Sequence, residues 1–121
     1  MKGILLTNNP AAAEKYSGQM ETMYLEGACL MDVLRLARDK VHMGHRLLTH
    51  PLSGSVKPGQ TPYKSLIISK ETDSLDLDSL KIIEDSIAMA NKQAETPDKN
   101  KELIKDYQLI DLSLIESATI P

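Results

Sequence analysis

The sequence predicts a small α/β domain whose mixed, mostly parallel four-stranded sheet is flanked by helices. Short apolar runs, clearest at residues 3–7 and 63–69, have the composition of strands that are buried on both faces. Elsewhere, apolar residues repeat at three- and four-residue intervals, which is typical of one face of a helix. The segments follow one another as β-α-β-α-β-β-α-α, and this alternation at the start predicts parallel crossover connections.

The first strand, residues 3–7, runs into the polar sequence TNNP. Asn9 is a residue type that caps helices, and Pro10 suits a first helical turn because it has no N–H to lose. We therefore expect a short helix over residues 11–16.

A second pair of elements follows that helix. Residues 22–26 predict a short strand, and residues 28–43 place their apolar side chains on one helical face. Gly44 suits the position just beyond this helix, because glycine readily adopts the left-handed conformation found there.

Two strands and two helices complete the chain. Residues 45–50 and 63–69 predict the third and fourth strands, which we expect to be antiparallel because no helix separates them. Asp76 or Asp78 is expected to cap the next helix. The apolar stripe of that helix consists of Leu80, Ile83, Ile87, Ala90 and Ala94. After a polar break, a last helix over about residues 99–117 is marked by Leu103, Ile104, Tyr107, Ile110 and Leu114.

Composition limits both the size of the core and the class of protein. The 121 residues suffice for one core, so we expect a single domain over residues 1–121. A net charge of −3 lacks the basic footprint of nucleic-acid-binding proteins. No apolar run approaches the roughly 20 residues that span a bilayer, and the N-terminal run is too short for a secretory signal. We therefore expect a cytoplasmic protein that binds neither nucleic acid nor membrane.

The connection over residues 51–62 is the most conspicuous gap in the apolar pattern. Connections in compact domains usually run about 4–6 residues, and structureless ones beyond roughly 12 tend to be functional or disordered. Three prolines restrict this backbone, which argues against a loose linker. Ordinary turn chemistry and the covering of a sheet edge are the alternatives to a ligand site here.

A second polar segment is expected to lie beside this connection. If the first and third strands are neighbours, the TNN sequence and the 51–62 connection leave the same sheet edge, where open α/β sheets bind ligands. A helix N-terminus, a lysine and several hydroxyls would favour an anion such as phosphate or carboxylate. The ligand-binding candidates are Thr7, Asn8, Asn9, Thr49, His50, Ser53, Gly54, Ser55, Lys57, Thr61 and Tyr63.

Other chemistry has weaker support in the sequence. His50 is the candidate general acid or base, but no Gly-x-Ser-x-Gly elbow supplies a hydrolase nucleophile beside it. The three histidines have no cysteine partners, and there is neither a P-loop nor a Gly-x-Gly-x-x-Gly sequence, so we expect no metal and no cofactor. Cys29, the single cysteine, is interpreted as a small buried apolar residue rather than a reactive thiol.

Four segments carry a family resemblance: LLTHPLSGSVKP at residues 47–58, TPYKS at 61–65, ILLTNNP at 4–10 and LKIIEDSI at 80–87. Together they resemble the GrdX family, whose members are encoded with the glycine, sarcosine and betaine reductase systems of amino-acid-fermenting anaerobes. The resemblance implies an accessory role and transfers no catalytic residues. Since that chemistry relies on reactive thiols and selenols, a chain with one cysteine is not expected to be a catalytic redox subunit.

Three hypotheses follow from these observations. The favoured one is a non-catalytic accessory protein that binds a small anionic metabolite, or a protein of the reductase complex, through residues 50–63. The first alternative is a small enzyme that uses His50 as acid or base on an anionic metabolite steadied by Lys57. The second is a structural subunit that forms a homo-oligomer, which an apolar stripe on the last helix too wide for one core would favour.

Overall fold

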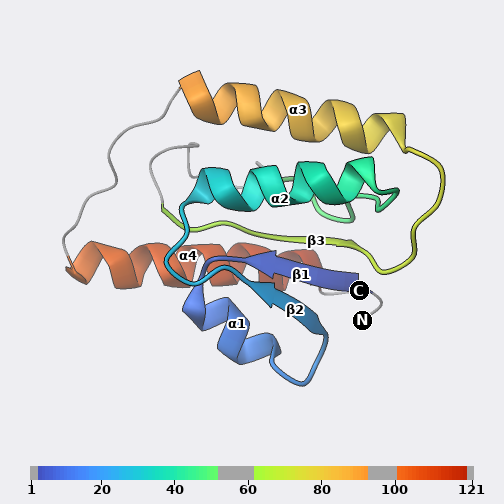
Figure 1. Cartoon of the computed structure of the whole chain (residues 1–121). Helices are drawn as coiled ribbons and strands as arrows, with labels where there is room; N and C mark the ends of the chain where they lie inside the picture. Colours follow the sequence, from blue (N-terminus) through green and yellow to red (C-terminus); the bar gives the residue numbers. More distant parts are fainter. Residues whose placement is uncertain (1–2, 52–61, 93–100, 120–121) are drawn as a thin grey trace.

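The computed structural model describes residues 3–51, 62–92 and 101–119 (Figure 1). Its strands are β1 (Gly3–Thr7), β2 (Glu21–Tyr24) and β3 (Ser65–Ser69). Its helices are α1 (Pro10–Tyr16), α2 (Leu30–His42), α3 (Leu77–Lys92) and α4 (Lys101–Thr119). The predicted α/β class is therefore confirmed.

The sheet has three strands in the order β2-β1-β3 within the described part of the chain. The central strand β1 pairs in parallel with β2, where Ile4 lies opposite Glu21, and antiparallel with β3, where Ile4 lies opposite Ile68. The sheet is mixed, as expected, but the prediction of four strands, mostly parallel, is wrong.

The missing fourth strand is the segment over residues 45–50, which runs beside β3 but forms a single antiparallel bridge, between Leu47 and Ile68. Side-chain hydroxyls replace the rest of the ladder. The bridge has backbone bonds from the Leu48 N–H to the Ile67 carbonyl oxygen and from the Ser69 N–H to the Arg46 carbonyl oxygen, both at 2.8 Å. Beyond them, the Arg46 N–H donates to the Ser69 hydroxyl at 2.8 Å, and the Ile67 N–H donates to the Thr49 hydroxyl at 3.0 Å. The Leu47 N–H, which is not a ladder group, donates to the Ser79 hydroxyl of α3 at 3.0 Å. A sequence pattern that records only apolar spacing does not reveal this exchange of partners.

The segment over residues 45–50 is separated from β1 by β3, so the condition set for a shared ligand crevice, that the first and third predicted strands are neighbours, is not met. The segment is antiparallel to β3, and β3 is antiparallel to β1. It therefore runs in the same direction as β1. Thr7 and His50 consequently lie toward the same end of the strands, with β3 between them.

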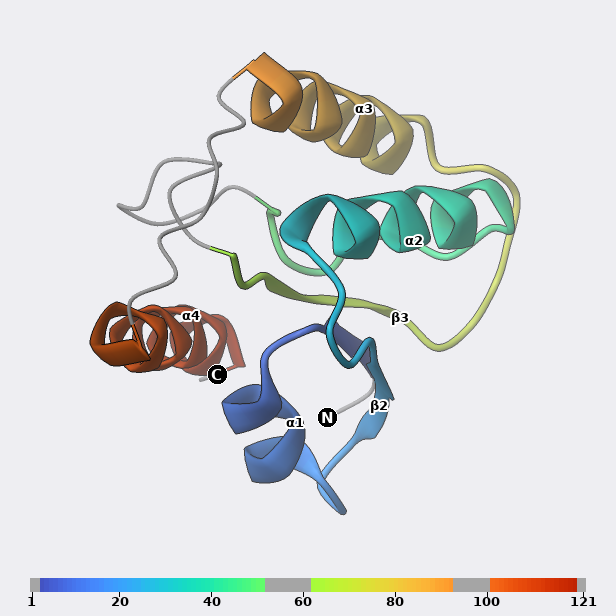
Figure 2. The ribbon, with the colours of Figure 1, turned by 60° about the vertical axis from the view of Figure 1, so that its left-hand side comes forward.

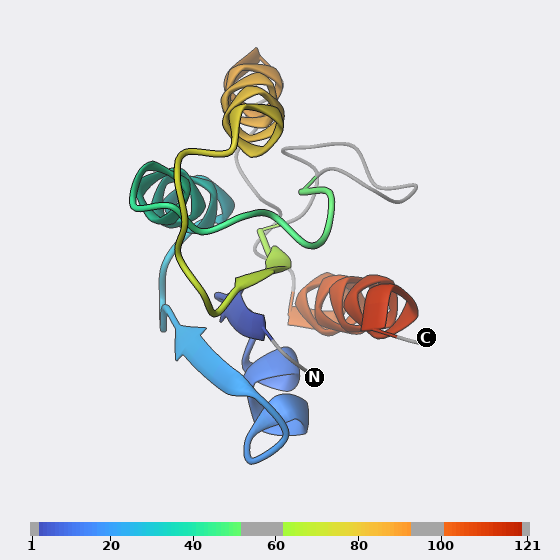
Figure 3. The ribbon, with the colours of Figure 1, turned by 90° about the vertical axis from the view of Figure 1, so that its right-hand side faces the viewer.

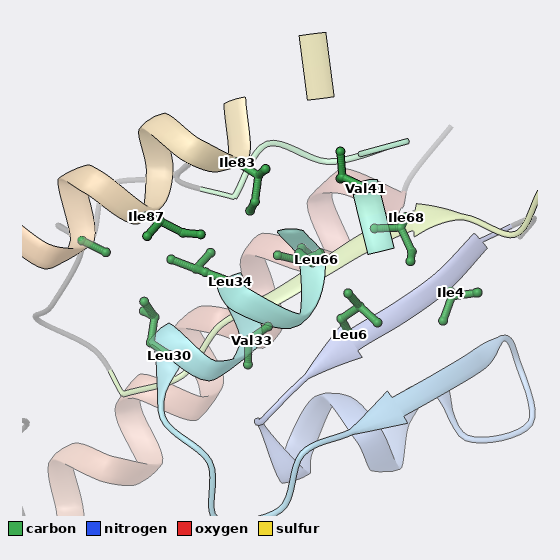
Figure 4. Close-up of a cluster of buried hydrophobic side chains, with 12 residues drawn as sticks. Ile4, Leu6, Leu30, Val33, Leu34, Val41, Leu66, Ile68, Ile83 and Ile87 are labelled. Atoms are coloured by element: carbon green, nitrogen blue, oxygen red, sulfur yellow. The ribbon is translucent and has the colours of Figure 1, made fainter. Parts of the chain in front are cut away.

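Helices cover both faces of the sheet, which explains the uninterrupted apolar strands. Figure 3 shows α2 on one face and α1 with α4 on the other, while α3 packs against α2. Alternate residues of β1 serve the two faces, with Ile4 and Leu6 toward α2 and Leu5 toward α1. The larger core cluster is formed by Ile4, Leu6, Leu30, Val33, Leu34, Ala37, Val41, Leu66, Ile68, Ile83, Ile87 and Ala90 (Figure 4).

The buried face of α4 differs from the face that the sequence predicts. Ile110, an expected core residue, is 40% exposed, whereas its neighbour Asp111 is only 4% exposed and Ile115 only 3%. The helix is thus rotated so that a carboxylate, rather than an isoleucine, faces the sheet. The prediction counted apolar residues alone, and the polar groups that Asp111 meets come from other elements.

Two predicted helix caps are confirmed. The Asn9 side-chain oxygen accepts the Ala11 N–H at 3.0 Å, with Pro10 in the first turn of α1. The Asp76 carboxylate accepts the Ser79 N–H at 3.1 Å at the start of α3.

Cys29 is exposed, so its interpretation as a buried apolar residue is wrong. It precedes α2, where the Asp32 carboxylate accepts its backbone N–H at 3.1 Å and its thiol at 3.3 Å. These two hydrogen bonds from Cys29 hold the pKa of Asp32 below its ordinary value. The thiol therefore serves as a donor within a helix cap.

Gly44 joins the end of α2 to the loop before α3. Its φ of +105° is rarely adopted by other residues, which confirms the sequence-based expectation of glycine here. A Cβ at this position would lie 2.2 Å from the Asp73 carbonyl oxygen, so the close approach also requires glycine.

We predict that Gly44→Ala lowers the free energy of unfolding by about 3 kcal/mol, because backbone strain and a backbone clash combine. Gly18→Ala is the matched control, since Gly18 also has a positive φ, of +81°, but its added Cβ would meet nothing within 4 Å. It should cost only about 1 kcal/mol. Urea denaturation measures both, and equal losses would contradict the role of the Gly44–Asp73 contact.

Candidate functional site

The candidate site lies at the edge of the sheet where β1 ends and β3 begins. Asn8, which is 3% exposed, ties three segments together at this edge. Its side-chain N–H groups donate to the carbonyl oxygens of Ala28 at 2.8 Å and Pro62 at 2.7 Å. Its side-chain oxygen accepts the Lys64 N–H at 2.9 Å. The chain that leads into β3 is therefore fixed against the end of β1.

Asp111 brings α4 to the same edge and is the most buried charged group described there. Its Oδ1 accepts the Ser65 N–H at 3.0 Å, while its Oδ2 accepts the Ser65 hydroxyl at 2.6 Å and the Asn9 side-chain N–H at 3.0 Å. A buried carboxylate needs several donors to offset its lost hydration. Asp111 obtains them from both β3 and the start of α1.

The hydroxyls at this edge form a directed chain of hydrogen bonds that ends on Asp111. The Asn9 N–H donates to the Thr7 hydroxyl oxygen at 2.9 Å. The Thr7 and Ser65 hydroxyls are 2.7 Å apart, and since Ser65 donates its proton to Asp111, Thr7 is the donor in that contact. Such a chain of bonds is mutually reinforcing in a low-dielectric interior.

The predicted ligand-binding candidates of the β1 end are thus occupied within the protein. Thr7, Asn8 and Asn9 are buried, and Asn9 also donates to the Gln108 carbonyl oxygen of α4 at 2.9 Å. Helices α1 and α4 lie side by side there (Figure 2). The anion that these donors bind is the Asp111 carboxylate of the chain itself.

The candidates on the other side of β3 surround a small recess. Its lining includes Thr49, His50, Lys64, Asp111, Leu114 and Ala118. The recess has a volume of about 10 Å³, which is room for one water-sized group. Tyr63 lies nearby in the chain, and its hydroxyl accepts a hydrogen bond from the Gln108 side chain at 2.9 Å. The remaining candidates, Ser53, Gly54, Ser55, Lys57 and Thr61, lie outside the described residues.

Sequence reasoning missed two residues of this edge, Lys64 and Asp111. Burial lowers the pKa of the Lys64 ammonium, and the negative charge of Asp111 acts in the opposite direction. The burial of Asp111 could have been predicted from its spacing in the sequence. It lies three or four positions from Tyr107, Leu114 and Ile115, on the same face of the helix. A charged residue on the apolar face of a helix indicates a buried partner network.

A second depression, larger than the recess, lies elsewhere on the described structure. A polar depression of about 430 Å³ at the far end of β3 includes Arg46, Glu71 and Asp73 in its lining. No group of three His, Cys, Asp or Glu residues suited to a metal ion occurs among the residues described. None of the described helices is long and apolar enough to cross a membrane.

Comparison with known protein families identifies the family of the chain. A family model described as GrdX-like protein matches residues 4–120, nearly the whole chain. No curated protein and no solved structure matches the chain.

We predict that Asp111→Ala lowers the free energy of unfolding by about 3 kcal/mol, because the buried donors of Ser65 and Asn9 lose their acceptor. Asp106→Ala, an exposed change on the same helix, should stay within about 0.5 kcal/mol. Asp111→Asn should also destabilise, since its amide would point a donor at the Asn9 donor. Chemical denaturation of all three tests this, and a stable Asp111→Ala variant would refute it.

Proposed function

Because the chain belongs to the GrdX-like protein family, we propose that it is an accessory, non-catalytic protein of a glycine reductase-type amino-acid fermentation system. In this proposal it binds a small anionic ligand, or a protein of the reductase complex, through residues 50–63. Family membership supports the link to a glycine reductase system. The polar residues around His50 support the proposed location of the binding site.

The observation that carries the binding proposal is the convergence of donors at one recess. Thr49, His50 and Lys64 come from segments on either side of the 51–62 connection, yet they line the same recess beside β3. Asp111 is the acidic residue in the lining of this recess. Both of its carboxylate oxygens already accept hydrogen bonds, from Ser65 and Asn9. The groups that face a ligand are therefore hydrogen-bond donors, which favours an anion.

We predict that His50→Ala and Lys57→Ala leave the fold intact but abolish stabilisation by an anionic ligand. The measurement is the melting temperature in a panel of small carboxylates and inorganic phosphate. A ligand at about 100 times its Kd should stabilise the wild type by roughly 2.7 kcal/mol. His42→Ala, which changes an exposed histidine at the end of α2, is the matched control and should respond like the wild type. Equal shifts in the wild type and the His50 and Lys57 variants would contradict the shared site.

The outer face of α4 favours a second function, contact with another copy of the chain. Leu109 is 62% exposed and Ile110 is 40% exposed, next to each other on this helix. The apolar surface of α4 is thus wider than the core of one domain covers, and adjoining exposed apolar residues are common where proteins associate.

We predict that the Leu109→Ser, Ile110→Ser double variant shifts any oligomer of the wild type toward the monomer, as measured by light scattering over a range of concentrations. The control is Met43→Ser, which changes a side chain of equal exposure, 62%, at the end of α2. A wild type that stays monomeric at high concentration, or an oligomer that survives the double variant, would exclude this surface.

A further inference from the structure

We propose that the β2 edge of the sheet pairs with the same edge of a second copy of the chain, antiparallel and in one register. The pairing joins two sheets into one continuous sheet across a two-fold axis. It is independent of the anion site, and it uses a different surface from the α4 face that carries Leu109 and Ile110.

β2 is the edge of the sheet that no other element covers in the described structure. It pairs with β1 alone, and Figure 3 shows it at the outer side of the sheet, away from α3 and α4. The opposite edge is covered, because residues 45–50 run beside β3 and the Leu47 N–H donates to Ser79 of α3. An uncovered edge presents its N–H and C=O groups to another strand.

The outward backbone groups of β2 belong to Thr22 and Tyr24. The Leu25 N–H donates to the Thr7 carbonyl oxygen at 2.8 Å, so the odd-numbered residues of this strand direct their backbone groups toward β1. Thr22 and Tyr24, the alternate residues, direct theirs away from the sheet. Outside the ladder with β1, neither makes a backbone hydrogen bond in the described structure.

These two residues fix the register with a second copy. When Thr22 of each strand lies opposite Tyr24 of the other, two symmetric pairs form, and each pair exchanges two backbone hydrogen bonds. A shift by two residues would bring Met20 or Glu26 opposite one of them instead. The Met20 N–H already donates to the Tyr16 carbonyl oxygen at 3.2 Å, and Glu26 lies in a turn beyond the strand.

The side chains that meet in this register are complementary. Tyr24, which is exposed, lies opposite the β-branched Thr22, and such pairs stabilise antiparallel strands. Met23, which packs against the larger core cluster on the other face, lies opposite its own copy on the axis. Glu21 lies opposite Leu25, so no two carboxylates oppose each other directly. The strand is therefore complementary to itself, which favours a second copy as its partner.

The register predicts which cysteine variant forms a covalent dimer. In a Cys29→Ser background, which removes the exposed thiol, Met23→Cys places two cysteines opposite each other with their Cα atoms about 4.5 Å apart. Disulfides usually span roughly 4.4–6.8 Å between Cα atoms. Thr22→Cys is the matched control, because its Cα atoms would be about 8 to 9 Å apart in the same dimer. Oxidation followed by non-reducing electrophoresis should give a covalent dimer for Met23→Cys alone.

The hydrogen bonds are tested by Thr22→Pro, which removes an outward N–H without removing a bond to β1. It should weaken the dimer by about tenfold or more in sedimentation equilibrium of the full chain, since each dimer loses two backbone hydrogen bonds. Thr22→Val, which keeps the N–H, should associate like the wild type. The Leu109→Ser, Ile110→Ser double variant should also keep the dimer, because it changes only the α4 face.

The β2 pairing is overturned if the wild type stays monomeric at high concentration, or if Met23→Cys and Thr22→Cys cross-link equally. A dimer that Thr22→Pro leaves unchanged, or that the α4 double variant abolishes, would also overturn it. The cross-linking pattern keeps the test decisive if Thr22→Pro fails to fold. None of these measurements involves an anion, so the failure of this inference and the failure of the anion site are distinguishable.

Discussion

The burial of Asp111 is the constraint on which this edge of the molecule depends. A carboxylate that loses its hydration inside a protein is costly unless several donors surround it. Here the donors come from β3 and from the first residues of α1, through Ser65 and Asn9. The position of α4 on the sheet is therefore fixed by polar geometry as well as by the apolar contacts of Ile115 and Leu112.

This arrangement divides the polar groups of the edge into two sets. Thr7, Asn8 and Asn9 satisfy one another and Asp111, so they hold β1, α1 and α4 together. Thr49, His50 and Lys64 instead line the recess together with Asp111. A rigid polar network next to a recess is a common way to preorganise a binding site. The proposed anion site would thus depend on Asp111 for its shape without using that residue as a contact.

The sequence predicted the elements whose causes are local. β1 and β3 were recognisable as apolar runs, because helices bury both of their faces. The Asn9 and Asp76 caps and Gly44 followed from the preferences of single residues. The errors arose where distant residues intervene. Residues 45–50 lack a full ladder because the Ser69 and Thr49 hydroxyls replace backbone partners, and Ile110 is exposed because α4 turns Asp111 toward Ser65.

For the candidate site, the sequence by itself predicted a sheet edge formed by Thr7–Asn9 and residues 50–63, predicted an anionic ligand there, and indicated the family to which the chain belongs. Local composition was enough for this, because long polar loops and strand ends are visible in one dimension. Only the tertiary structure decided which polar groups are already satisfied and which face the recess. Lys64 and Asp111 acquire their roles from burial and from partners that are distant in the chain, such as Asn9, which bonds Asp111 across 102 positions. A hydrogen bond of that kind depends on how the elements pack, and no pattern of neighbouring residues encodes it.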